Sequence, residues 1–359
     1  MIRLKILLVF LSFLLPAPLF AAELIVDDPV IVPARVSEVV SQRSEVLPGL
    51  HIERTIQTLT LIGNGEDNKG TFYTLENDRA VLEKGDRVWL AIRTNTLGEE
   101  SISVQEIDRR VPLMLLFSVF VILVIFLSRW QGVRAIFGLL ASIFIIGYVL
   151  VPSLTKGHPP VLTASLVAIV ISIGSMILVH GWKNSTKAAI GGTVIAIVCT
   201  SILSYAVIIF ASLSGITDDA SVYLSLSQGV KLDLSGLLLG AMIIGVLGVL
   251  DDATITQAET VATIHSANPK ATRYELYKQG MRVGHEHISA LVNTLALAYT
   301  GAALPLLLLF SYSNQSIGYL GSLEIVSTEI LRILVGSIGV VLAVPISTFF
   351  AAYLYKGRN

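Results

Sequence analysis

The densest group of side chains that could do chemistry lies in the last third of the chain. Asp251 and Asp252 are adjacent near the end of a long apolar stretch, and Gln257 follows within two helical turns. Adjacent carboxylates repel each other, so they invite a cation or one of them takes up a proton. Acids at the C-terminal end of a helix also oppose its dipole, which disfavours a purely structural role.

A second apolar stretch begins at residue 285 and carries further polar side chains. On a helix, Glu286 and Asn293 share one face at i and i+7, and His287 and Thr294 share an adjoining face. Asn293 lies about 10 Å along the axis from Glu286. An asparagine at this depth binds a ligand or donates hydrogen bonds between helices.

Two helices joined by a short hairpin pack side by side, so the polar groups of both stretches are expected to converge. Carboxylate, imidazole and amide groups together could bind a divalent cation or pass protons. The spacing matches no established metal-ligand motif, so metal and cofactor identity stay unassigned. The predicted ion-binding residues are Asp251, Asp252, Gln257, Glu286, His287, Asn293 and Thr294.

Four further residues are assigned structural or coupling roles. Tyr299 lies a few residues before Pro305, which favours a distorted helix. Glu329 and Arg332 stand at i and i+3 and predict a local ion pair. Pro345 predicts a second helix break, and broken helices at membrane depth are typical of transporters.

Composition excludes one large soluble globule. Hydrophobic residues make up 53% of the 359 residues and charged residues 14%, against about 25% charged in soluble domains. The segment 23–110 holds 26 charged residues, whereas 111–359 holds only 23. No basic surface suited to nucleic acid is present. The single cysteine, Cys199, excludes an intramolecular disulfide and a cysteine-based zinc site.

The apolar part of the chain predicts a polytopic α-helical membrane protein, because about 20 apolar residues cross a bilayer as a helix. We predict a seven-helix transmembrane domain over 110–359, with a cytoplasmic helical hairpin at 253–285. The seven predicted spans are 111–128, 135–154, 160–180, 188–213, 234–250, 288–310 and 330–354.

The polar N-terminal part predicts an exported domain. A basic start, a short apolar run and small residues up to Ala22 predict a signal peptide over 1–22, with a retained anchor as the alternative. Alternating apolar residues such as Val88, Leu90 and Ile92 predict short strands. We therefore expect a small closed β-barrel or sandwich over 23–109.

Loop charges set the predicted orientation. With the β domain outside, ten lysines and arginines fall at the cytoplasmic ends of the spans, and three fall at the other ends. This bias follows the positive-inside rule. The β domain is thus expected to be extracytoplasmic and the C-terminus cytoplasmic.

Several motifs, in order, resemble the YibE/F-like family of bacterial multi-pass membrane proteins. They are the runs 245–257, 284–288, 293–305 and 329–339, which together extend over most of 110–355. Where the family often has Arg-Asp-His, this chain has His285-Glu286-His287 and so keeps the carboxylate. The resemblance implies a fold in the bacterial cytoplasmic membrane, and it implies no established activity.

Three functions are compatible with these features. The leading hypothesis is a non-enzymatic transporter or permease for a small ion, with a cation as the candidate substrate and proton coupling as an option. The alternative is an envelope assembly or sensor protein whose β domain binds an envelope partner. The third is an intramembrane hydrolase that uses Asp251, Asp252 and His287 as acid–base groups. The expected partners are the lipid bilayer and, as an open option, a second copy of the chain.

Overall fold

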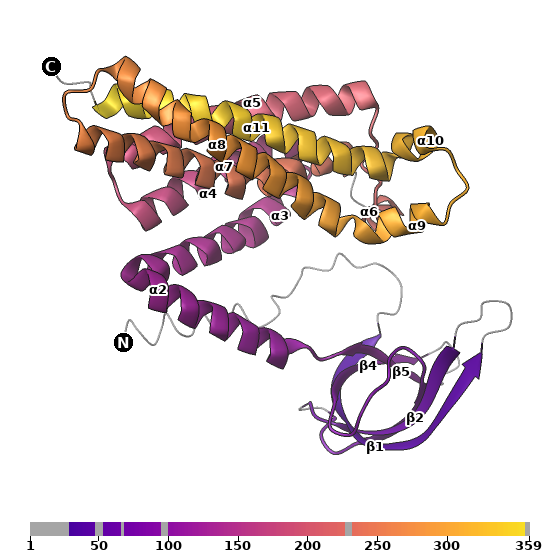
Figure 1. Cartoon of the computed structure of the whole chain (residues 1–359). Helices are drawn as coiled ribbons and strands as arrows, with labels where there is room; N and C mark the ends of the chain where they lie inside the picture. The colour runs from indigo at the N-terminus through magenta and orange to yellow at the C-terminus, as the bar shows by residue number, and fades with distance from the viewer. Residues whose placement is uncertain (1–28, 47–52, 66–67, 95–99, 227–231, 356–359) are drawn as a thin grey trace. The chain divides into compact units, whose positions relative to one another are not determined.

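The computed structural model of the chain describes residues 29–46, 53–65, 68–94, 100–226 and 232–355. The chain divides into two compact units, Met1–Phe120 and Val121–Asn359. The first unit contains the strands, and the second contains the helical bundle (Figure 1). The predicted signal peptide lies outside the described residues, and the predicted domain limits at residues 22 and 109 stay predictions.

The strands form one antiparallel sheet in the order β3-β2-β1-β4-β5. After three consecutive strands, β4 returns to pair with β1, which is a Greek-key connection. Figure 1 shows the sheet curled into a half-barrel, and its core includes the buried Leu59, Leu61 and Leu90. The strands are β1 (Val30–Val46), β2 (Glu53–Gly63), β3 (Phe72–Asn77), β4 (Arg87–Thr94) and β5 (Glu100–Ile107).

The structure shows a curled half-barrel sheet, and the expected closed barrel or sandwich stays a prediction. In the described residues β3 and β5 form the two edges and are not paired by a backbone ladder. A side chain links these edges instead, because Arg79 Nη1 donates a hydrogen bond to the Gln105 carbonyl oxygen at 2.7 Å. Alternating sequence patterns predict strands but not their register, so they do not predict whether the two edges of the sheet pair.

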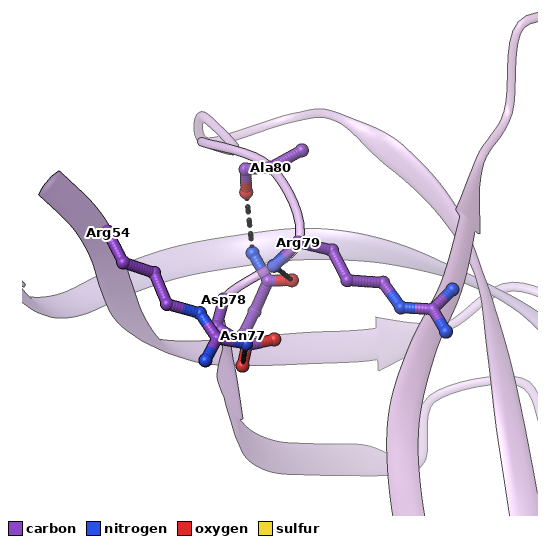
Figure 2. A network of polar contacts seen from close by, with 5 residues as sticks. All are labelled: Arg54, Asn77, Asp78, Arg79 and Ala80. Carbon is purple, nitrogen blue, oxygen red and sulfur yellow. Dashed lines mark hydrogen bonds and ion pairs between the residues drawn. The ribbon is translucent and has the colours of Figure 1, made fainter. Parts of the chain in front are cut away.

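The connection from β3 towards β4 is held by its own side chains. Figure 2 shows that Asn77 donates a hydrogen bond to the Ala80 carbonyl at 2.6 Å and accepts one from the Arg79 backbone at 3.3 Å. Asp78 forms an ion pair with Arg54 on β2. These contacts fix the segment that carries Arg79 to the opposite edge of the sheet.

A clamp of three side chains stands where β5 leads into the first long helix. Asp108 accepts a hydrogen bond from the Arg110 backbone N–H at 3.0 Å and two from its guanidinium at 2.7 and 2.8 Å. The guanidinium carbon lies 4.8 Å from the centre of the Trp89 ring. Hydrogen bonding from Arg110 lowers the pKa of the Asp108 carboxyl below its usual value.

Because of this clamp, we expect the stability of the first unit to depend on pH. Because the pKa of Asp108 is lower in the folded state, its stabilisation is complete above about pH 4, the unfolded value, and is lost as pH falls through the folded value. We expect Asp108→Asn to destabilise the first unit by about 1–2 kcal/mol at neutral pH. Thermal unfolding of the full chain in detergent should show this difference shrinking towards pH 3.

Glu106→Gln provides the matched control for this measurement. Glu106 pairs with Arg109 at 2.9 Å, but both side chains are about 60% exposed. Exposed ion pairs contribute little to stability, so this variant should unfold like the native chain. Equal unfolding midpoints for Asp108→Asn and the native chain at neutral pH would contradict the clamp.

The described elements that follow β5 are helices. The elements are α2 (Arg110–Ile145), the π-helix η1 (Ile146–Leu150), α3 (Val151–Thr155), α4 (Pro160–His180), α5 (Asn184–Ala211), α6 (Asp219–Leu226), α7 (Leu234–Ala267), α8 (Arg273–Ala302), α9 (Leu304–Ser311), α10 (Ile317–Ser322) and α11 (Glu324–Tyr355). A short turn that contains Pro269 joins α7 to α8 within the helical hairpin predicted over 253–285. Thr272 and Glu275 form a capping box that starts α8.

Five helical stretches of the described chain are long and apolar enough to cross a membrane, and the bent pair α8 and α9 makes six. One of the five, Arg110–Thr155, contains two predicted spans. The backbone at Arg129 is non-helical (φ 51°, ψ −129°) and divides α2 between them. A β-carbon at Gly132 would lie 2.4 Å from the Val124 carbonyl oxygen, so glycine permits the tight bend seen in Figure 1. The exact number of crossings stays a prediction.

Within the bundle, α7 and α11 are the central helices. α11 packs on α5, α7 and α8, and α7 also packs on α4 and α5. The distortion expected around Pro305 is present as a 60° bend between α8 and α9. The break expected at Pro345 is wrong, because α11 continues as one helix through that residue.

Candidate functional site

Asp251 and Asp252 lie in the C-terminal half of α7, about 26 Å along the axis from its start at Leu234. They line a cavity of about 440 Å³ between the second half of α2, α4 and α7, which we call the aspartate cavity. Ser172 of α4 donates a hydrogen bond to the Asp251 carboxylate at 2.5 Å. No lysine or arginine is among the described residues that line this cavity.

His180, the last residue of α4, stands beside these aspartates. Its imidazole lines the aspartate cavity and lies within electrostatic range of the Asp252 carboxylate. It also lines a second cavity of about 430 Å³, which we call the glutamate cavity after Glu259. His180 is therefore the polar residue that the two cavities share.

The glutamate cavity continues along the same face of α7. Its polar lining includes Thr256, Glu259 and Thr263, which follow Asp252 at helical spacing. Glu259 accepts a hydrogen bond from Ser185 of α5 at 2.8 Å, and Lys183 lies 4.0 Å away. One face of α7 thus carries carboxylates from Asp251 to Glu259, with His180 between them.

Two contacts tie α7 to its neighbours α5 and α8. The hydroxyls of Thr193 on α5 and Thr254 on α7 are both buried and lie 2.6 Å apart. Gln257 is fully buried, and its side-chain nitrogen donates to the Gly280 carbonyl of α8 at 2.7 Å. These contacts fix the rotation of α7 and so direct its two aspartates towards α4.

The structure gathers only part of the predicted ion-binding set. His287, half-buried on α8, lies within electrostatic range of Asp252. Gln257 ties α7 to α8 and lines neither cavity. Glu286, Asn293 and Thr294 are exposed on α8 and line neither cavity. Their role in ion binding stays a prediction.

The packed face of α8 explains this difference. Its buried residues are Leu276, Gly280, Gly284 and Leu295, so the glycines turn towards α7 and α11. A β-carbon at Gly284 would lie 2.8 Å from Val344 of α11. The face of α8 that carries Glu286 and Asn293 is therefore turned away from the bundle, although polar membrane residues usually face inward.

No resident metal site is formed by the described side chains. Among these residues, no group of three or more His, Cys, Asp or Glu side chains is placed to hold a metal ion. The carboxylates of Asp251 and Asp252 can contact a partly hydrated cation that passes through the cavity, and the His180 imidazole can exchange protons.

The predicted coupling residues form a second cluster. Arg332 Nη1 pairs with Glu329 Oε1 at 2.8 Å, which confirms the expected ion pair on α11. The Arg332 guanidinium lies 5.7 Å from the centre of the Tyr299 ring. Gly245 of α7 faces the Tyr299 hydroxyl, and a β-carbon there would be 3.1 Å from it. This cluster joins α7, α8 and α11 beside the bend before α9.

Comparison with protein families places these helices in one family. The description "YibE/F-like protein" matches residues 116–357. The chain belongs to the YibE/F-like family. The matched segment contains both cavities and the Tyr299 cluster, whereas the β domain precedes it. Together with the long apolar helices, membership in the YibE/F-like family identifies a multi-pass membrane protein. Comparisons with curated proteins and with solved structures found no match.

In this YibE/F-like chain, the sequence analysis did not predict the site residues that α4 and α5 contribute. Ser172, His180 and Ser185 were not singled out. His180 gave a usable signal, because an ionisable side chain at the end of an apolar span marks a functional site by default. Ser172 gave none, since it is 79 residues from Asp251 and serines are common in membrane helices.

Proposed function

We propose that this chain is a permease for a small inorganic cation in the bacterial cytoplasmic membrane. The observation that carries the proposal is the aspartate cavity, where two carboxylates face a space within the membrane helices and no lysine or arginine is among the described lining residues. Acidic pore linings select cations, because they replace part of the hydration shell of the ion. In this proposal Asp251 and Asp252 bind the ion directly.

His180 extends the proposed path. It separates the aspartate cavity from the glutamate cavity and lies between Asp252 and Glu259. An imidazole at such a junction can pass a proton from one cavity to the other. We therefore propose that cation movement is coupled to protons, and that the chain acts without enzymatic chemistry.

The proposed orientation follows from the loop charges. The bias of lysine and arginine puts the β domain outside and the hairpin between α7 and α8 in the cytoplasm. The glutamate cavity then opens near the cytoplasmic surface, and the aspartate cavity lies deeper. Cations would reach the aspartates past Glu259 and His180.

Flux in proteoliposomes tests the proposal. The purified full chain should carry one or more ions from a panel of Na⁺, K⁺, Mg²⁺, Ca²⁺, Mn²⁺, protons and chloride. We expect cation flux without chloride flux, and Asp252→Asn should lower it at least about tenfold. Absence of all flux from folded protein would overturn the proposal and favour the envelope partner of the β domain.

A further inference from the structure

The exposed side of α8 differs from the lipid-facing sides of the other membrane helices. On α4, the exposed residues Leu162, Leu166 and Val170 are apolar and suit a hydrocarbon environment. On α8, the exposed side carries a stripe of charged, polar and small residues at heptad spacing, beside the exposed Val283 and Leu297. The stripe consists of Arg282, Glu286, Ser289, Asn293, Ala296 and Thr300, which we call the α8 seam; all are exposed except the half-buried Ala296.

Asn293 makes this side costly in a bilayer. It lies within the predicted span 288–310, about two turns from Glu286. In the part of the chain that the structure describes, its amide has no hydrogen-bond partner, whereas Ser289 bonds to the carbonyl of His285 at 3.1 Å. An unpaired amide in hydrocarbon costs several kcal/mol. The α8 seam is therefore expected to be covered by something other than lipid.

We infer that the α8 seam is the interface between two copies of this chain, related by a two-fold axis along the membrane normal. The spacing supports this, because residues at a and d positions of a heptad meet in a parallel helix pair. Here Glu286, Asn293 and Thr300 occupy a positions, and Arg282, Ser289 and Ala296 occupy d positions.

The polar groups of the α8 seam in one copy are complementary to those of the same seam in a second copy. An asparagine amide both donates and accepts, so Asn293 pairs with its symmetry mate, as an a-position asparagine does in coiled coils. Arg282 and Glu286 are in adjacent layers about 6 Å apart along the axis, so the long Arg282 side chain can reach diagonally to the Glu286 carboxylate of the other copy. Small residues at 289 and 296 let the helix backbones approach closely. A second copy satisfies all of these groups without any other partner.

Disulfide crosslinking in proteoliposomes tests this interface. The lone cysteine, Cys199, is first replaced by serine, and single cysteines are placed at Ser289, Asn293 or Ala296. Mild oxidation should join most of the protein into dimers at these positions. Leu166→Cys on the exposed side of α4 is the matched control and should stay monomeric. Equal crosslinking at all four positions would mean random collision, and absence of crosslinks along the α8 seam would overturn the interface.

Subunit counting in lipid nanodiscs gives a second, independent readout. Asn293→Leu should weaken the dimer about tenfold, because polar pairs between membrane helices contribute about 1–2 kcal/mol. Asn293→Gln, which keeps an amide, should retain more dimer than Asn293→Leu. A native chain that stays monomeric at every protein-to-lipid ratio would contradict the proposal. This inference does not depend on ion transport, since neither experiment measures flux.

Discussion

Replacing Asp251 by asparagine is expected to reduce cation flux about a hundredfold or more. At about 4 Å and an effective dielectric of about 20, a carboxylate attracts a monovalent cation by about 4 kcal/mol. Each loss of about 1.4 kcal/mol changes a rate or occupancy tenfold. The asparagine side chain would keep the size of the original and its contact with Ser172, so the variant removes charge rather than packing.

Two further variants make the measurement decisive. Ser172→Ala removes the hydrogen bond that holds Asp251 and should lower flux about tenfold, which is the range of a bond to a charged group. Asp219→Asn removes an exposed carboxylate on α6, outside both cavities, and should leave flux unchanged. All proteins are first compared by thermal unfolding. Native flux in a folded Asp251→Asn variant would exclude Asp251 as an ion ligand.

The extent of the helices follows closely from the sequence. The predicted span 160–180 coincides with α4, because Pro160 begins an apolar run that Gly181 ends. The predicted span 234–250 lies within α7, which continues to Ala267 into the helical hairpin predicted over 253–285. Its extension carries polar residues, so a search for apolar spans stops before the helix does. Local propensity and hydropathy fix such features without knowledge of neighbours.

The side of α8 that packs against the bundle is harder to predict from the sequence. The polar residues suggested that the Glu286 side faces the bundle, on the general rule that ionisable groups avoid lipid. Gly280 and Gly284, spaced four residues apart, suggested the other side, because small residues allow close helix packing. In the structure, the side of α8 that carries the two glycines is the side that packs against the bundle. On α8 the spacing of small residues therefore predicts the exposed position of Asn293, whereas polarity does not.

Contacts between distant helices could not be predicted from one sequence. Asp251 is seen in the sequence, but its partner Ser172 is on a helix that no local pattern connects to α7. The same holds for His180, whose importance comes from the two cavities that it separates. These pairs depend on how the helices pack. The sequence alone therefore predicts the carboxylates of the site but not the residues that surround them.

The contact between α5 and α11 gives the prediction with the largest expected effect on stability. A β-carbon at Gly192 would lie 2.7 Å from the Ser347 β-carbon and 3.0 Å from its α-carbon. Because Ser347 backbone atoms cannot move aside, the two helices must separate. We expect Gly192→Ala to destabilise the bundle by about 1–3 kcal/mol, the usual cost of overpacking.

The neighbouring glycine is a matched control. At Gly191 a β-carbon would lie 3.5 Å from the Phe350 ring, which is an ordinary contact. Alanine is a better helix former than glycine, so Gly191→Ala should be neutral or stabilise by up to about 1 kcal/mol. Thermal unfolding of both variants in the same detergent separates packing from helix propensity. Because the two changes add the same methyl group to adjacent residues of α5, equal unfolding midpoints would mean that α5 and α11 are not in close contact at Gly192.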